Sequence, residues 1–440
     1  MDFIKWFYPG MHVKRWLFLI MGGVIIISLG FGYILREVYI HYTFPSFVYY
    51  ITLQFIPRYA RAALFFGIGV TGILMAILRL NKSLLSAYAP ARPGDDKLVD
   101  IIYYQRHLKR GPKIVAVGGG TGLPMLLRGL KEYTGNLTAV VTVADDGGSS
   151  GVLRRELGVL PPGDFRNCIA ALADAEPLMT KLFQYRFSQG SGLEGHSFGN
   201  LFILAMSGVM GTFERAIKES SRVLAVRGQI LPSTLANITL SAQMEGEVRV
   251  QGESNIPSSG QRIKHVFLEP ENVDAYPEAM QALMEADLIV LGPGSLYTSV
   301  LPNLLVTGIR NAIKASGAVK VYACNVATQK GETDGFTAAD HVAALHAHCG
   351  EGLFHYVLAN SRTDVSLPFE SPVQMVLPGE GDFGGAQLVL ADVVSADNTL
   401  RHDPKRLADS VMRLYYDRGA ARRDNGSTEK AAAVYRAASG

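Results

Sequence analysis

The residue pattern best suited to chemistry is GGGTG at positions 118–122, which follows the apolar run 113–117 and precedes a helix-like segment. Glycines let a ligand approach the main chain, and the first turn of a helix presents free N–H groups with positive partial charge. Leu123 interrupts a full G-x-G-x-x-G pattern, and there is no P-loop motif G-x-x-x-x-G-K-[ST], which excludes a P-loop ATPase. The stretch predicts a phosphate or nucleotide site that includes Gly119, Gly120, Thr121 and Gly122.

A second candidate is VADDGGSSG, residues 143–151, which follows the apolar run 137–143. Asp145 and Asp146 lie roughly where dinucleotide-binding proteins place an acid for ribose hydroxyls. The small residues after them, including Ser149, are typical of an anion-binding nest, and paired carboxylates are oxygen ligands for a divalent cation such as Mg²⁺. A solvated turn is the alternative interpretation. Residue type alone therefore does not decide among ribose recognition, metal binding and a solvated turn.

Three further loops are polar where an apolar run ends or a helix begins. In PPGDFRN, Asp164 is predicted as the N-cap of a helix with Asn167 in its first turn. In GHSFGNL, Ser197 is the candidate cap and Asn200 follows it; a lone histidine such as His196 is more often structural. GPGSLYTS, residues 292–299, follows the apolar run DLIVL. The carboxyl ends of parallel strands meet at one edge of a sheet, so these loops are expected to converge.

Composition excludes several other functions. The chain has 42 Lys+Arg against 39 Asp+Glu, a net charge of +3, which is too even for nucleic-acid binding by bulk electrostatics. The scattered Cys168, Cys324 and Cys349 form no C-x-x-C pair and fit a reducing compartment. No G-x-S-x-G, H-E-x-x-H or Cys/His metal spacing occurs, so covalent catalysis and a zinc site have no sequence support.

The elements that must position these loops are short apolar runs alternating with helical stretches. Strands are expected over 113–117, 137–143, 287–291, 319–324, 354–358 and 387–393. Helices are expected over 123–133, 164–173, 198–207, 213–225, 337–346 and 404–416. This alternation predicts an α/β fold with a Rossmann-like, doubly wound, mostly parallel sheet. Residues 237–268 alternate polar and apolar side chains and predict a small antiparallel addition.

The N-terminal region differs in composition from the rest. Residues 16–35 form an uncharged run of 20 and residues 62–78 a second of 17, the lengths of membrane-spanning helices. We therefore expect a two-helix transmembrane hairpin (1–80), a linker (81–112), a nucleotide-binding α/β domain (113–420) and a flexible tail (421–440). Because the thiols need a reducing environment, the expected location is the inner membrane, multi-pass, with the large domain in the cytoplasm.

The loop motifs GGGTGL, VADDGGSSG, PPGDFRNC, GHSFGNL, GPGSLYTS and NVATQKGETDG together resemble the gluconeogenesis factor family (YvcK-like). That family is a branch of the 2-phospho-L-lactate transferase (CofD-like) superfamily, and the resemblance covers residues 113–416. It implies a Rossmann-like fold, binding of UDP-N-acetylglucosamine, and roles in gluconeogenic growth, cell-wall synthesis and cell shape. Carried onto this sequence, it places around the nucleotide the residues Gly119, Gly120, Thr121, Gly122, Asp145, Asp146, Asp164, Asn167, Asn200, Gly292, Pro293, Gly294, Ser295, Tyr297, Thr298 and Arg401.

Two functional hypotheses follow from the resemblance. The first is a membrane-tethered UDP-sugar-binding regulator, with a wall-synthesis or metabolic protein as partner and a homo-oligomer as the assembly. The second is a transferase that moves a phosphoryl-linked group from a nucleotide-activated donor. In that enzyme Asp145 and Asp146 would hold Mg²⁺, which would stabilise charge on the leaving phosphate. An NAD(P) oxidoreductase is disfavoured by the interrupted glycine pattern.

Overall fold

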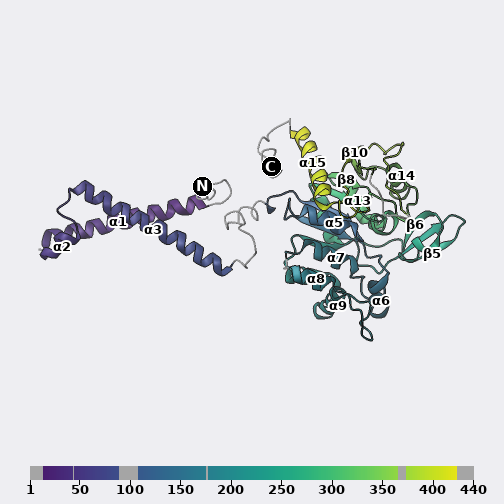
Figure 1. The fold of residues 1–440 in the computed structure, drawn as a ribbon, viewed down its shortest axis with the longest axis horizontal. Helices are drawn as coiled ribbons and strands as arrows, with labels where there is room; N and C mark the ends of the chain where they lie inside the picture. Colours follow the sequence, from purple (N-terminus) through teal and green to yellow (C-terminus); the bar gives the residue numbers. More distant parts are fainter. Residues whose placement is uncertain (1–12, 43, 89–107, 175–176, 365–372, 424–440) are drawn as a thin grey trace. The chain divides into compact units, whose positions relative to one another are not determined.

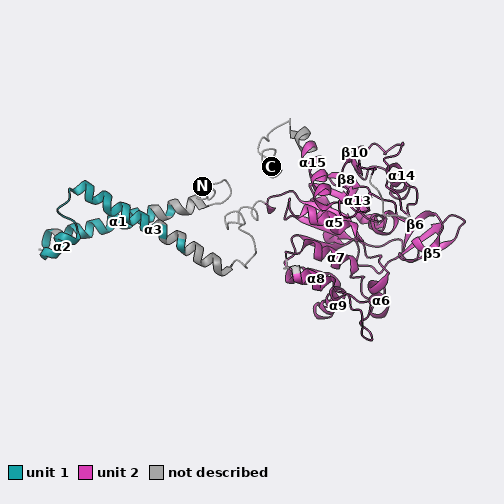
Figure 2. Ribbon diagram, viewed as in Figure 1, with its two compact units in different colours: residues 1–107 teal, residues 108–440 magenta. Residues whose placement is uncertain are grey.

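The computed structural model describes residues 13–42, 44–88, 108–174, 177–364 and 373–423 (Figure 1). The chain divides into two compact units, residues 1–107 and 108–440 (Figure 2). The predicted linker (81–112) and tail (421–440) lie largely outside the described residues.

The described residues of the first unit form the helices α1 (Val13–His41), α2 (Ser46–Ile51) and α3 (Arg58–Tyr88). The two expected spans, 16–35 and 62–78, fall within α1 and α3, so their helical character is as predicted. Across the described part of the chain, however, no helix is long and apolar enough to cross a membrane. The prediction of a transmembrane hairpin is therefore not supported.

The second unit is built on a seven-stranded parallel sheet in the order β10-β9-β8-β7-β1-β2-β3. Its strands are β1 (Ile114–Gly118), β2 (Leu137–Val141), β3 (Gln229–Pro232), β7 (Leu288–Leu291), β8 (Val319–Ala323), β9 (Tyr356–Asn360) and β10 (Gln387–Ala391). The central strands β1, β2, β7 and β8 are buried at every position, which explains why they read as continuous apolar runs. The mostly parallel sheet predicted from the sequence is confirmed.

The strand order reverses between β1 and β7. The chain leaves β1 towards β2 on one side, whereas β7 leads to β8 and β9 on the other. Because crossovers between parallel strands are right-handed, the helices of the two halves cover opposite faces of the sheet. The helices are α5 (Gly122–Leu130), α6 (Gly148–Leu157), α7 (Gly163–Leu172), α8 (Pro177–Gln184), α9 (Phe198–Met210), α10 (Phe213–Val223), α11 (Pro277–Met284), α12 (Leu301–Leu305), α13 (Thr307–Ala315), α14 (Ala338–Cys349) and α15 (Pro404–Arg423).

A small antiparallel sheet, ordered β5-β4-β6, is inserted between β3 and α11 (Figure 1). It consists of β4 (Thr239–Met244), β5 (Arg249–Gln251) and β6 (Ile263–Glu269), and the short 3-10 turn Pro257–Ser259 lies between β5 and β6. This confirms the antiparallel addition expected over 237–268. Its position matters for function, because the loop after β5 reaches the edge of the parallel sheet.

One strand of the main sheet, β3, was not predicted. It has only four residues, lies at the sheet edge and ends at Pro232, a residue that cannot donate a ladder hydrogen bond. The preceding Gly228 has φ +95°, and a side chain there would meet the carbonyl of Leu137 in β2. Nothing in the short local pattern distinguishes such an edge strand from a loop.

Candidate functional site

The glycine stretch forms the turn between β1 and α5, at the carboxyl edge of the sheet. Gly120 has φ +62°, the left-handed region that glycine adopts at little cost. Gly122 lies against the Gly292–Ser295 loop after β7, where a Cβ atom would come within 2.9 Å of the nitrogen of Gly294. The two loops therefore touch at the point where the strand order reverses, which is where ligands bind in open α/β sheets.

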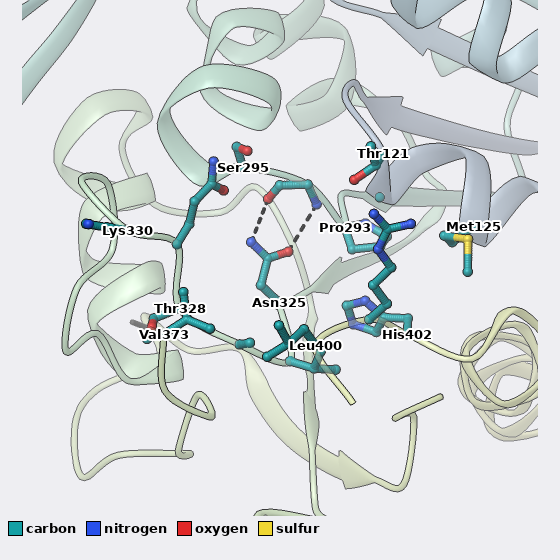
Figure 3. Close-up of a pocket in the computed structure, with 16 residues that line it drawn as sticks. Thr121, Met125, Pro293, Ser295, Asn325, Thr328, Lys330, Val373, Leu400 and His402 are labelled. Carbon is teal, nitrogen blue, oxygen red and sulfur yellow. Dashed lines mark hydrogen bonds between the residues drawn. The ribbon is translucent and has the colours of Figure 1, made fainter. Parts of the chain in front are cut away.

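A cavity of about 240 Å³ opens beside these two loops (Figure 3). It is bounded by the start of α5, the loop after β7, the loop after β8, and the segment that precedes α15. Its lining residues include Thr121, Gly122, Pro293, Gly294, Ser295, Asn325, Thr328, Lys330, Leu400, Arg401 and His402. Six residues predicted from the sequence thus line one cavity: Thr121, Gly122, Pro293, Gly294, Ser295 and Arg401.

Asn325 fixes the shape of this cavity. Its side-chain Nδ2 donates to the carbonyl of Gly294 at 2.9 Å, and its Oδ1 accepts from the N–H of Gly294 at 3.1 Å (Figure 3). This pair of bonds ties the loop after β7 to the end of β8. Asn325 is the first residue of the NVATQKGETDG motif, but its contact with Gly294 depends on strand adjacency that the local sequence does not contain.

The neighbouring wall is held by His402. Its ring Nε2 is 3.1 Å from the carbonyl oxygen of Cys324, and only 6% of the residue is exposed. Burial lowers the pKa of His402 to about 4, so the ring is neutral at physiological pH and donates to the carbonyl. The anchored ring holds the adjacent Arg401, which is exposed, at the rim of the cavity.

The charge of the cavity suits an anion. Two cationic residues, Lys330 and Arg401, belong to its lining, and among the residues that the structure describes no acidic residue does. The N-terminus of α5 adds N–H groups and positive partial charge at Gly122. Backbone amides, a helix terminus and two cations around a glycine turn are the groups that bind phosphates in other nucleotide sites.

The opposite side of the glycine turn is acidic. The N–H of Gly120 donates to Asp164 Oδ2 at 2.8 Å. Burial, together with the nearby charge of Asp145, raises the pKa of Asp164 to about 7. Burial also raises the pKa of Asp145, although the N–H of Gly147 donates to its Oδ1 at 3.0 Å. The predicted N-cap role of Asp164 is wrong: α7 begins one residue earlier, after Pro162, and the carboxylate bonds to a different element.

Two acids absent from the predicted site complete this side. Glu253 comes from the loop after β5; burial raises its pKa to about 8, with further contributions from Asp145 and Glu332. Burial raises the pKa of Glu332 to about 7, and Glu332 accepts hydrogen bonds from the Thr298 hydroxyl at 3.0 Å and the Tyr297 N–H at 3.3 Å. Glu253 lies in an insert far along the chain from the glycine motif, so no local signal marks it.

The remaining predicted residues take different positions. Asp146 accepts from the N–H of Ser254 at 2.9 Å and so contacts the insert. The Tyr297 ring is buried against Phe336 and His348 rather than in the cavity, and Thr298 is buried with Glu332. Gly119 and Gly292 lie inside closely packed turns. A side chain on Gly119 would meet Asp164 and Thr142.

Asp145 and Asp146 each accept a hydrogen bond from a backbone N–H, that of Gly147 and that of Ser254 respectively. Within the described residues, no group of three or more His, Cys, Asp or Glu side chains is placed to hold a metal ion. Mg²⁺ commonly binds through one or two carboxylates together with substrate phosphates. These residues therefore fit a cation that arrives with a nucleotide better than a resident metal.

Comparison with known proteins agrees with this geometry. Residues 114–374 match the family model described as 2-phospho-L-lactate transferase CofD. A Nostoc protein called "Putative gluconeogenesis factor" is 46% identical over 94% of this chain and 93% of its own length. This chain belongs to the gluconeogenesis factor family. The Bacillus subtilis gluconeogenesis factor is 50% identical over 69% of this chain and 98% of its own length.

A crystal structure of another gluconeogenesis factor relative, from Bacillus halodurans, superposes with a TM-score of 0.64 at 45% identity. It covers 69% of this chain and 99% of its own. Both Bacillus proteins therefore match a part about the size of the second unit, whereas the Nostoc relative matches nearly the whole chain. The α/β unit is the part that the shorter and longer gluconeogenesis factors have in common.

Proposed function

We propose that the chain binds a UDP-sugar, UDP-N-acetylglucosamine, at the edge of its parallel sheet and acts as a regulatory factor in gluconeogenic growth, cell-wall synthesis and cell shape. The observation that carries the proposal is the cationic, glycine-walled cavity at the strand-order reversal. Family membership supports the physiological part, since the curated relatives are named gluconeogenesis factors.

In this proposal the diphosphate lies against the first turn of α5, between Arg401 and Lys330. The N–H groups at the start of α5 and the two cations neutralise its charge. Asn325 contributes by holding the Gly294 main chain in place for close approach by the ligand. The apolar Leu400 and Val373, also in the lining, offer a surface for the base.

A partner protein of wall synthesis or central metabolism would distinguish the ligand-bound from the free state. A ligand changes such an equilibrium only through its differential affinity for the two states. A transferase reaction remains the alternative, with Mg²⁺ entering with the nucleotide, and it requires turnover of a nucleotide-activated donor.

Calorimetric titration of the full chain with UDP-N-acetylglucosamine, UDP, GDP and NAD tests the proposal. Saturable binding of the UDP compounds, with weaker binding of GDP and NAD, is the expected result. The absence of binding by every UDP compound would refute it. Addition of Mg²⁺ and chromatographic analysis of the ligand after incubation would detect turnover, which would favour the transferase.

A further inference from the structure

A buried polar cluster lies at the sheet edge beside β2, on the acidic side of the glycine turn. Its members are Ser149 in the first turn of α6, His196 and Ser197 before α9, Asn200 in the first turn of α9, and Arg166 in the first turn of α7. Ser149 Oγ is 2.9 Å from His196 Nδ1 and accepts from Asn200 Nδ2 at 3.0 Å. Four of these residues, Ser149, His196, Ser197 and Asn200, are at least nine-tenths buried.

The cluster is incomplete as it stands. Asn200 Oδ1 is buried and has no hydrogen-bond partner, although Asn200 is only 1% exposed. Reversing the amide would pair the oxygen with the Ser149 hydroxyl but would leave the nitrogen unpaired, so either orientation leaves one buried polar atom open. A buried polar atom without a partner costs about 1–3 kcal/mol. A bound ligand group or an ordered water supplies the missing bond at such an atom.

Arg166 leaves a second open group. Its Nη1 donates to Ser197 Oγ at 2.6 Å and its Nη2 to Asn167 Oδ1 at 2.8 Å, while its buried Nε has no partner. The arginine stem passes so close to Gly199 that a Cβ atom there would lie 2.7 Å from Arg166 Cγ. The cluster thus offers an open acceptor on Asn200 and an open donor on Arg166. Hydroxyl groups, which both donate and accept, are the ligand chemistry that fits.

The cavity is too small to hold a whole nucleotide sugar. Pockets for drug-sized ligands measure roughly 300–1,000 Å³, and the cationic cavity is smaller, at about 240 Å³. Part of a nucleotide sugar must therefore lie outside it. The cavity lies on the β7 and β8 side of the glycine turn, whereas the bond between Gly120 and Asp164 joins the turn to the α7 end that carries Arg166.

From these observations we infer that Asn200, Ser149 and Arg166 form a hydroxyl-recognising subsite for the sugar that a UDP-sugar carries beyond its diphosphate. The inference rests on the proposed function, because the nucleotide defines which group reaches the cluster. His196 is a positioning residue, since it contacts Ser149 rather than the open atoms of Asn200 and Arg166.

Titration of the full chain with UDP, UDP-glucose and UDP-N-acetylglucosamine separates the subsite from the rest of the site. Asn200→Ala is expected to weaken both UDP-sugars by about fivefold or more and to leave the affinity for UDP within twofold of wild type. Ser149→Ala, a milder change, should lower sugar affinity in the same selective way. Ser220→Ala is the matched control, because it removes another buried oxygen without a partner, in α10, and should change no affinity.

Failure of the proposed function and failure of the sugar subsite give different results. If the wild-type chain binds no UDP compound, the proposed function is refuted, and the proposed sugar subsite is refuted with it. If wild type binds but Asn200→Ala and Ser149→Ala weaken UDP and UDP-sugars equally, or not at all, the nucleotide site stands and the subsite is refuted. Thermal melting of each variant establishes that it is folded, and Ser149→Ala decides the outcome if Asn200→Ala does not fold.

Discussion

The backbone N–H of Gly120 donates a 2.8 Å hydrogen bond to the carboxylate of Asp164, which lies 44 residues further along the chain. The bond joins the glycine turn after β1 to the first turn of α7. It also divides the sheet edge into a cationic side, with Arg401 and Lys330, and an acidic side, with Asp145 and Glu253.

Asp164→Asn should stabilise the protein above neutral pH. The pKa of Asp164 is raised from 3.8 to about 7 by burial, so its contribution to stability is fully present below pH 3.8 and is lost as pH rises through about 7. Asparagine keeps an acceptor for the Gly120 N–H and carries no charge. Thermal melting should therefore show a higher Tm than wild type at about pH 8, and the difference should shrink as the pH falls towards 3.8. A lower Tm at the higher pH would contradict the burial of an ionised Asp164.

His402 should make the protein acid-sensitive. Its pKa falls from 6.5 to about 4 on folding, so its contribution is present above pH 6.5 and is lost as pH falls towards 4. His341 and His348 shift in the same direction, so a single substitution removes only part of the effect. His402→Gln should reduce the loss of Tm on acidification. If the Tm of His402→Gln falls on acidification as much as that of wild type, groups other than His402 cause the acid sensitivity.

Arg401→Ala should weaken UDP-N-acetylglucosamine by about tenfold to a hundredfold, the range expected for loss of a charged hydrogen-bonding partner. The matched control is Arg406→Ala. Arg406 lies five residues after Arg401, is exposed, and forms an ion pair with Asp392 at 2.6 Å. Calorimetry should show wild-type affinity for the control. Equal effects of the two substitutions would mean that Arg401 acts only through general charge.

Asn325→Ala removes both bonds to Gly294 and should destabilise the fold by about 1–3 kcal/mol while lowering nucleotide affinity. Asn325→Asp keeps the acceptor for the Gly294 N–H, loses the donor to its carbonyl and adds a negative charge beside the cavity. In Asn325→Asp a carboxylate oxygen faces the Gly294 carbonyl, so denaturant unfolding and calorimetry should show losses of stability and affinity at least as large as those of Asn325→Ala. Unaltered affinity in both would show that the loop is held without Asn325.

The central sheet was predictable because β1, β2, β7 and β8 are buried on both faces and so appear as apolar runs. The convergence of the glycine and GPGS loops followed from the rule that strand ends share an edge. Local caps were less predictable: Ser197 caps α9 as expected, accepting from the Asn200 N–H, whereas Asp164 does not cap α7. The difference lies in a tertiary partner, Gly120, that competes for the carboxylate.

The side chains that complete the site were harder to find from sequence. Tyr297 and Thr298 follow the GPGS loop, but the π-helical turn Leu296–Val300 directs them into the core. Glu253 reaches the edge only because the antiparallel insert folds back, with Ser254 bonded to Asp146. His196 contacts Ser149, 47 residues away, so a lone histidine in sequence is part of a buried network in the fold.

The most direct test of the central claim is a crystal structure of the full chain with UDP-N-acetylglucosamine. The account predicts density for the diphosphate between the first turn of α5 and Arg401, with the sugar directed towards Asn200. A nucleotide bound elsewhere, or a diphosphate turned away from both α5 and Arg401, would contradict it.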